Sequence, residues 1–134
     1  MNFEEAKFKA VKYLGISKKT EQEVTLKLKR LDVDEFIIDK VIRYLAEYGY
    51  INDSDYVDSY IRQNKRMLKY SIYEITEKLK AKGIKKDILE DKLDLLASSE
   101  YEKEIIKKII NAKSKTVDEY KIKQYLYRRG FKNF

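Results

Sequence analysis

Three stretches of this sequence carry the same apolar pattern at intervals of about fifty residues. The three copies are Val24, Leu28 and Val33, then Ile75, Leu79 and Ile84 at an offset of 51, then Ile122, Leu126 and Phe131 at a further offset of 47. A period of this size indicates one supersecondary unit copied in tandem, in which each copy buries its apolar face against a neighbour. Arrays of this kind are usually binding surfaces rather than enzymes.

The composition agrees with an array of amphipathic helices. Of the 134 residues, 40% are charged and 43% are apolar, with no proline, no cysteine and four glycines, so no flexible linker is indicated. The lack of cysteine excludes disulfides and thiol chemistry. No apolar run is long enough to span a membrane, and the first residues do not resemble a signal peptide. We therefore expect a soluble, cytoplasmic protein without a membrane partner.

Helical periodicity runs through the chain and predicts an all-α fold. Residues 20–23 and 71–74 fit the capping box and should begin two helices, and Asp34 and Asp53 are expected to cap two others. The apolar face of the helix after Asp34 is predicted to carry Ile37, Val41, Ile42 and Leu45. The helix after Asp53 is expected to reach about residue 69.

These helices group into a tandem array of three-helix repeats of about fifty residues. We expect repeat 1 at residues 1–50, repeat 2 at residues 51–98 and an incomplete repeat 3 at residues 99–134. Repeat 3 is predicted to have two helices, at about 100–112 and 117–129, and to lack the last helix, for which the final residues leave no room.

An ordered set of short runs stands out within this array. It consists of residues 18–24, Leu28, Val41-Ile42, Leu45, Gly49-Tyr50-Ile51-Asn52-Asp53, Tyr56-Val57, Tyr60-Ile61, Ile75-x-x-x-Leu79-x-x-Lys82-Gly83-Ile84 and Leu126-Tyr127-Arg128-Arg129-Gly130-Phe131. At these spacings the set resembles the RecX family, and the resemblance covers most of the chain. Ser71, Tyr73 and Glu74 depart from it, because members often carry glycine and basic residues there.

The resemblance implies a regulator of the recombinase RecA, which acts in DNA recombination, DNA repair and the SOS response. It implies binding to the RecA–single-stranded DNA filament, within its helical groove, and inhibition of filament growth or of RecA's activities. The expected partners are therefore the RecA filament and single-stranded DNA, contacted directly or through RecA. We expect the chain to act as a monomer.

Basic residues are concentrated in repeat 3. Residues 1–50 and 51–98 each carry 10 basic and 9 acidic side chains, whereas residues 99–134 carry 10 and 5, within a formal net charge of +7. A basic excess is the electrostatic mark of a nucleic-acid partner, although most lysine-rich faces are simply solvated.

A second basic cluster lies in repeat 2, on the long helix predicted after Asp53. Four cations there are spaced at i, i+3, i+4 and i+7, which puts them on one stripe of a helix, where like charges repel unless an external anion balances them. A phosphate backbone or an acidic surface of RecA would do so, and so would nearby acids such as Glu74 or Glu77. Together the candidate residues for contact with RecA or DNA are Arg62, Lys65, Arg66, Lys69, Lys107, Lys108, Lys121, Lys123, Tyr127, Arg128 and Arg129.

Tyrosine is the other bias of the sequence, with twelve residues and no tryptophan. Aromatic rings beside cations can stack the bases of single strands. At helical spacing, however, tyrosines more often fill the seams between units. We expect about three in four of them, or more, to pack, and Tyr127, beside Arg128 and Arg129, to be the one that contacts a partner.

The sequence offers little for catalysis. It has no histidine and no cysteine, which removes the commonest general base, the thiol nucleophile and the usual zinc ligands. Asn52, Asp53 and Asp55 lack the glutamate and glycine that complete a calcium loop. We expect no enzymatic activity, cofactor or metal site. Two other classes remain open: a DNA-binding protein of helix-turn-helix type, and a helical-repeat scaffold for protein interactions.

Overall fold

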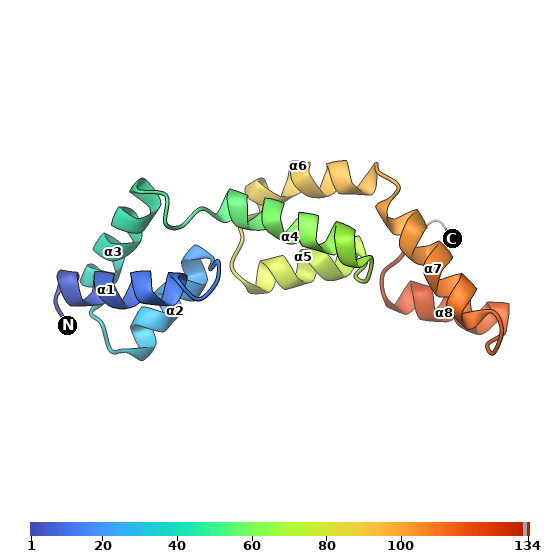
Figure 1. The fold of residues 1–134 in the computed structure, drawn as a ribbon, viewed down its shortest axis with the longest axis horizontal. Helices are drawn as coiled ribbons and strands as arrows, with labels where there is room; N and C mark the ends of the chain where they lie inside the picture. Colours follow the sequence, from blue (N-terminus) through green and yellow to red (C-terminus); the bar gives the residue numbers. More distant parts are fainter. Residues whose placement is uncertain (133) are drawn as a thin grey trace. The chain divides into compact units, whose positions relative to one another are not determined.

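The computed structural model describes residues 1–132 and 134 of the chain. Within them it contains eight helices and no strand, so the predicted all-α fold is confirmed. In chain order these are α1 (Phe3–Leu14), α2 (Glu21–Arg30), α3 (Glu35–Glu47), α4 (Asp53–Met67), α5 (Ile72–Ala81), α6 (Lys86–Ala97), α7 (Tyr101–Lys113) and α8 (Glu119–Arg128) (Figure 1). None of these described helices is long and apolar enough to cross a membrane.

The helices form groups of three, α1–α3 and α4–α6, followed by α7 and α8. The chain divides into two compact units that do not coincide with these groups. Unit 1 comprises Met1–Tyr56 with Lys82–Ile84, and unit 2 comprises Val57–Ala81 with Lys85–Phe134. The repeat boundaries at residues 50 and 98 stay a prediction.

The two predicted capping boxes are both formed. At the start of α2, the Thr20 hydroxyl accepts a hydrogen bond from the Glu23 amide at 3.2 Å, and the Glu23 carboxylate accepts one from the Thr20 amide at 3.0 Å. At the start of α5, Ser71 and Glu74 repeat the pattern at 3.1 and 2.9 Å. Each pair satisfies two amides that the first turn of a helix leaves without partners. Asp34 also caps α3 as predicted.

Helix α4 begins at Asp53, as predicted, but the prediction of its capping residue was wrong and the helix ends two residues earlier than expected. Its first turn is capped by Asn52, whose side-chain oxygen accepts from the Asp55 amide at 3.0 Å, while the Asp53 carboxylate accepts from the Glu21 amide at 3.0 Å instead. The helix ends at Met67 because Leu68 adopts a left-handed conformation, with φ of 51°. Lys69 therefore lies beyond the helix.

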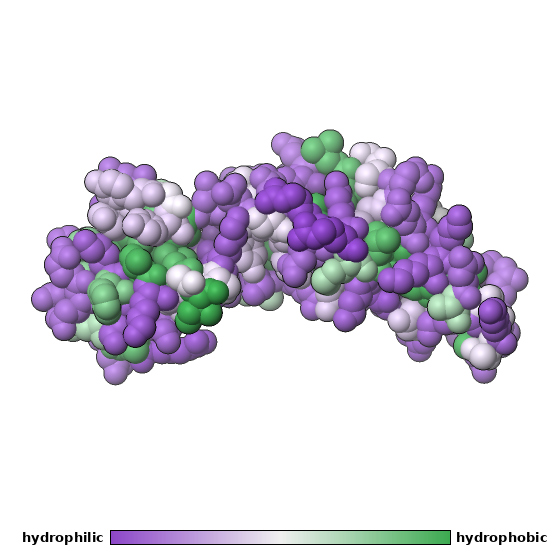
Figure 2. Space-filling view, in the orientation of Figure 1, coloured by the Kyte–Doolittle hydropathy of each residue, from purple (hydrophilic) through white to green (hydrophobic). Residues whose placement is uncertain are grey.

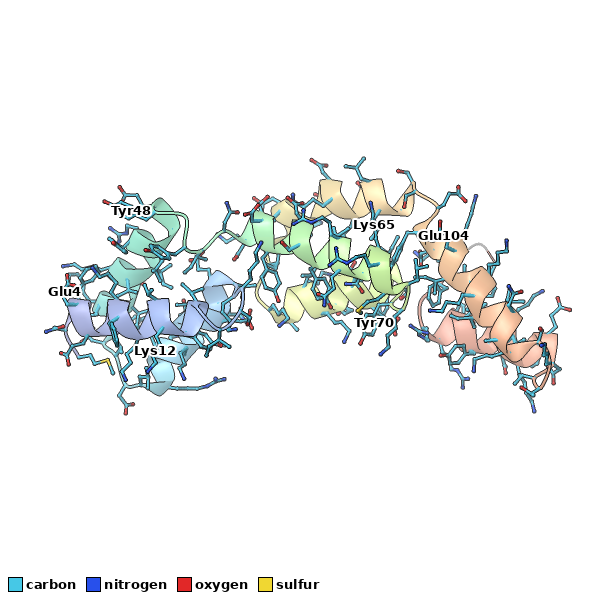
Figure 3. All side chains as sticks on the ribbon, viewed as in Figure 1. Glu4, Lys12, Tyr48, Lys65, Tyr70 and Glu104 are labelled. Carbon is cyan, nitrogen blue, oxygen red and sulfur yellow. The ribbon has the colours of Figure 1, made fainter. Side chains whose placement is uncertain are left out.

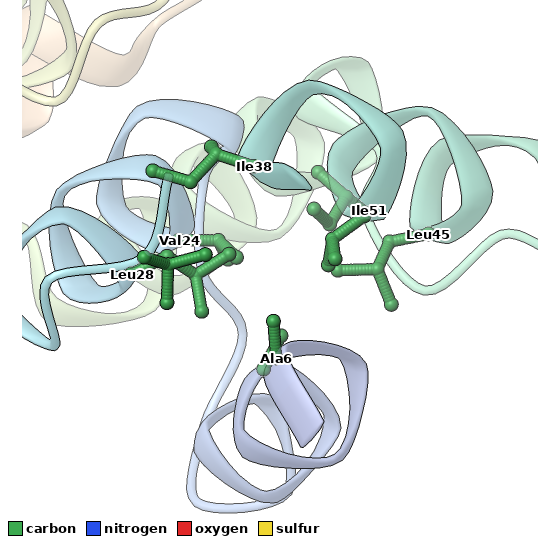
Figure 4. Close-up of a cluster of buried hydrophobic side chains, with 9 residues drawn as sticks. Ala6, Val24, Leu28, Ile38, Leu45 and Ile51 are labelled. Carbon is green, nitrogen blue, oxygen red and sulfur yellow. The ribbon is translucent and has the colours of Figure 1, made fainter. Parts of the chain in front are cut away.

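The core of unit 1 forms where α1 packs on α2 and α3. Ala6 and Ala10 are fully buried on one face of α1, and their small side chains allow the helix to approach its neighbours closely (Figure 4). On α3 the buried residues are Ile38, Val41 and Leu45. Ile37 and Ile42, which were predicted to share that face, are only half-buried, because the face turned to α1 and α2 runs through Ile38.

The apolar positions that define the repeat are buried in every copy. Their exposed fractions are at most 6% in all nine cases, which are Val24, Leu28, Val33, Ile75, Leu79, Ile84, Ile122, Leu126 and Phe131. Truncating a buried leucine of this kind typically costs about 2–5 kcal/mol. The period of the sequence therefore marks the residues that hold each unit together.

The glycine before the last repeated apolar residue is required for two reasons, its backbone conformation and the close approach of another side chain. Gly130 has φ of 86°, and the Phe131 amide returns to the Leu126 carbonyl at 3.1 Å, which closes the end of α8. A Cβ at Gly130 would also lie 2.6 Å from Tyr73 Cβ, and one at Gly83 would lie 2.2 Å from the Gln22 side chain. The first copy has Asp32 at this position, with φ of 58°.

We expect Gly130→Ala to destabilise the protein more than Gly49→Ala. Both positions have positive φ, so both variants bear a conformational cost of about 1–2 kcal/mol. Only at Gly130 does the new methyl group meet another side chain, because nothing lies within 4 Å of a Cβ at Gly49. Urea-induced unfolding followed by circular dichroism measures the difference. Equal losses would show that the contact with Tyr73 relaxes freely.

Candidate functional site

A buried hydroxyl links the start of α2 to residues that follow α5. Thr20, which is 0% exposed, donates to the Lys82 carbonyl at 2.7 Å while it caps its own helix. The Lys82 ammonium lies 3.5 Å from the Glu23 carboxylate, and Gly83 abuts Gln22. We call this set the first cap joint, and all of its residues belong to unit 1.

A second cap joint, within unit 2, repeats these contacts between the start of α5 and the end of α8. Ser71, also 0% exposed, donates to the Arg129 carbonyl at 2.6 Å. Arg129 forms an ion pair with Glu74 at 2.8 Å, and Gly130 abuts Tyr73. These residues stand at the same offsets of 51 and 47 as the apolar repeat. The departures from the resembled family at Ser71, Tyr73 and Glu74 therefore all fall in this joint.

Arg129 is held more firmly than the other candidate cations. Its guanidinium also donates to the Tyr125 hydroxyl at 3.3 Å and to the Lys69 carbonyl. Burial alone would raise the pKa of the Glu74 carboxyl, but the hydrogen bonds from Arg129 and Ser71 outweigh it and lower that pKa. The hydrogen bond to Glu74 in turn raises the pKa of Arg129. Arg129 thus serves the joint rather than the open surface.

The basic stripe of α4 is shorter than predicted. Arg62, Lys65 and Arg66 lie on the helix and are exposed, and Lys65 projects from α4 in Figure 3. Lys69 is exposed but stands after the end of the helix, with its ammonium 5.3 Å from the Tyr70 ring centre. Arg62 donates to the Ser59 hydroxyl at 3.0 Å. The structure therefore brings together three of the four predicted cations on one helix.

The remaining candidate cations lie on α7 and α8. Lys107 and Lys108 are exposed on α7, and Lys121, Lys123 and Arg128 are exposed on α8. Figure 2 shows hydrophilic residues over most of the visible face, with apolar residues in separate patches.

Three of the predicted residues, Lys123, Tyr127 and Arg128, line one hollow on unit 2. Tyr120, Gln124 and Phe134 complete its lining. Sequence reasoning missed these three residues. The spacing of seven between Tyr120 and Tyr127, which places two rings on one side of a helix, is the signal that could have found Tyr120.

Seven of the twelve tyrosines are buried or half-buried, a majority but fewer than the predicted share of about three in four. Tyr101, for example, is 4% exposed and donates its hydroxyl to the Tyr70 carbonyl. Burial raises the pKa of Tyr101 and keeps it neutral. Tyr127 is 77% exposed, and its role as a contact residue stays a prediction.

No metal site is apparent in the part of the chain that the structure describes. Its histidine, cysteine, aspartate and glutamate residues form no group of three or more that could hold an ion.

The fold and the two cap joints define a helical-repeat protein with exposed basic faces. A family model described as "RecX, first three-helix domain" matches residues 6–45. The regulatory protein RecX of Clostridium beijerinckii is 37% identical over 132 residues, which cover 95% of this chain and 61% of that protein. The regulatory protein RecX of Caldanaerobacter subterraneus subsp. tengcongensis is 33% identical and is covered to 64%.

Solved structures agree with these relatives. The crystal structure of RecX from Lactobacillus salivarius matches 97% of this chain and 88% of its own with a TM-score of 0.82 and 31% identity. The chain belongs to the RecX family, as the resemblance predicted. It spans less than two thirds of the length of the curated relatives named above. Their designation as regulatory proteins agrees with the expectation of a non-enzyme.

We expect Ser71→Ala to destabilise the protein by about 1–3 kcal/mol, because the Glu74 amide and the part-buried Arg129 carbonyl both lose a partner. Asp34→Ala is the matched control, since it removes an exposed cap that makes one such bond and should cost about 1 kcal/mol. Urea-induced unfolding compares them. A loss at Ser71 no larger than that at Asp34 would contradict the double role of the hydroxyl.

We expect Glu74→Gln to lower the free energy of unfolding by about 1–2 kcal/mol at neutral pH and to make little difference in acid. A carboxyl whose folded pKa is depressed stabilises the fold fully above its ordinary value of 4.5, and this stabilisation disappears as the pH falls through the lower folded pKa. Glu77→Gln, on the same helix, removes only an exposed pair at 4.0 Å and should change little at any pH. Unfolding curves recorded from neutral pH downward would show the two variants converging.

Proposed function

We propose that this chain binds the RecA–single-stranded DNA filament and inhibits the ATPase and recombinase activities of RecA. The observation that carries the proposal is membership of the RecX family, which rests on 31% identity across 88% of a solved RecX chain. The resemblance implies that this family regulates RecA, and tandem helical repeats commonly serve as binding surfaces.

The exposed cations of α4 support a polyanionic or acidic partner. Arg62, Lys65 and Arg66 repel one another at their helical spacing. The described residues supply no ion pair to Lys65 or Arg66. A phosphate backbone, or an acidic surface of RecA, relieves this repulsion on binding.

The mechanism follows from an array laid along the filament groove. Bound in this way, the chain contacts neighbouring RecA subunits and blocks the movements that ATP hydrolysis and subunit addition require. Its cations release counterions from DNA on binding, so inhibition becomes weaker as salt concentration rises.

We expect the protein to lower the single-strand-dependent ATP hydrolysis of its cognate RecA at concentrations well below saturation of the DNA. The triple variant Arg62→Glu, Lys65→Glu and Arg66→Glu should require an at least about ten-fold higher concentration for the same inhibition, because it replaces three attractive charges by repulsive ones. The measurement is a titration of ATP turnover at two salt concentrations.

A matched control reverses the same number of charges on unit 1. Lys9, Lys12 and Lys29 are exposed residues of α1 and α2, and their change to glutamate alters the net charge equally. If both triple variants lost the same amount of inhibition, the effect would come from net charge alone, and the α4 face would be removed from the proposal. Absence of inhibition by the folded wild-type protein would overturn the proposal itself. Inhibition that salt does not weaken would favour a scaffold that contacts RecA alone.

A further inference from the structure

The outward face of α8 presents two aromatic rings to solvent. Tyr120 is 70% exposed and Tyr127 is 77% exposed, and no other aromatic side chain in the described residues exceeds 66%. Seven residues separate them, which corresponds to two helical turns and a separation of about 10 Å along the axis. Buried residues Ile122 and Leu126 attach the opposite face of α8 to unit 2.

The space beside these rings is hollowed and partly organised. Tyr120 and Tyr127 line a hollow of about 430 Å³ together with Phe134, Lys123, Gln124 and Arg128. The Gln124 amide donates to the Tyr120 hydroxyl at 3.0 Å, which holds that ring against the helix. The hollow is thus bordered by aromatic rings and by two cations.

Comparison of the repeats shows that this face is not another cap joint. Asp118 stands where Thr20 and Ser71 stand at the offsets of 51 and 47. It caps α8 by accepting from the Lys121 amide at 2.9 Å, but an ionised carboxylate has no proton to donate to a carbonyl of a following segment.

The charge at the neighbouring position is also reversed. Lys121 stands where the two joints have the acidic residues Glu23 and Glu74. In the joints these acids pair with Lys82 and Arg129, whereas Lys121 would repel a basic residue in the same place. Tyr120 itself occupies the position of Gln22 and Tyr73, which press on the joint glycines. Within the described residues the third copy therefore lacks the contacts of the two joints, and the aromatic ring at this position, Tyr120, is exposed.

The charges around the rings identify the ligand class. Lys121 and Arg128 are exposed, and the described residues provide neither with an ion pair. Lys123 has the Glu119 carboxylate at 3.4 Å, at an exposed site where such a pair is weak. Exposed aromatic rings interleaved with cations fit single-stranded nucleic acid, because bases stack on the rings while phosphates pair with the cations.

We propose that Tyr120 and Tyr127 stack bases of single-stranded DNA directly, with Lys123 and Arg128 on the flanking phosphates. The inference deepens the proposed function, on which it rests for the presence of a DNA strand, and places part of that strand on α8 rather than on RecA alone. An amphipathic segment of a partner protein is the competing occupant. It accounts less well for the two cations at the rim of the hollow.

The test measures the affinity of a fluorescein-labelled oligothymidine by fluorescence anisotropy, without RecA. We expect Tyr120→Ala and Tyr127→Ala each to weaken binding about ten-fold. Tyr127→Phe should bind like the wild type, because the ring is kept, whereas Tyr127→Leu should lose affinity as alanine does. Phe8→Ala is the matched control, since it removes a 64% exposed ring from α1 and should change nothing.

Two further arms separate stacking from other kinds of contact. A strand of the same length made of abasic nucleotides keeps every phosphate and should bind the wild type about as weakly as the oligothymidine binds the alanine variants. Arg128→Gln should reduce the dependence of affinity on salt, while Tyr127→Ala should leave that dependence unchanged. Circular dichroism confirms that each variant is folded.

The outcomes are distinguishable from those of the RecA assay. Base stacking would be overturned if the wild type bound the abasic strand as tightly as the oligothymidine, or if the alanine variants bound like the wild type. It would also be overturned if Tyr127→Leu kept the full affinity for the oligothymidine, and this result would favour an apolar contact with a protein. Inhibition of RecA without any binding to the bare strand would overturn the inference and leave the proposed function intact. Strand binding that depends on the two rings, without inhibition of RecA, would support the inference and overturn the proposed function.

Discussion

One buried hydroxyl serves two segments in each cap joint, and much of the remaining architecture depends on it. Thr20 and Ser71 each accept the amide three residues ahead and donate to a carbonyl far along the chain. An aliphatic side chain at either position would leave a part-buried carbonyl and an amide without partners, which costs more than the net gain of an ordinary hydrogen bond. The neighbouring glycine and ion pair are the consequences of bringing those segments so close.

The joints matter because the individual helices are short. Helices of 10 to 15 residues have little stability alone, and each group of three offers only a small core. The repeated apolar positions supply that core, whereas each cap joint ties the start of one helix to a later segment of the same unit. A polar contact of fixed geometry does this better than apolar packing, since the hydrophobic effect has no direction.

The second joint also changes the significance of the basic residues. Arg128 and Arg129 are adjacent and chemically identical, yet Arg129 is bound to Glu74, Tyr125 and Lys69, and Arg128 is exposed on the outer face of α8. The basic excess of the last 36 residues is therefore not uniformly available to a partner. The part that remains available includes the cations beside Tyr120 and Tyr127, where the joint chemistry of the earlier copies has been replaced.

The sequence by itself determined the all-α fold, the two capping boxes, the nine buried apolar positions and the RecX family. These features depend on interactions within a turn or two of helix, or on a repeating pattern, so they can be predicted from the order of residues in the sequence. It did not reveal that Asn52 rather than Asp53 caps α4, because the two side chains can compete for the same amide. Nor did it separate Arg129 from Arg128, or show that Ser71 donates to a residue 58 positions away. Only the tertiary structure decided these points, because they depend on which faces of distant helices come together.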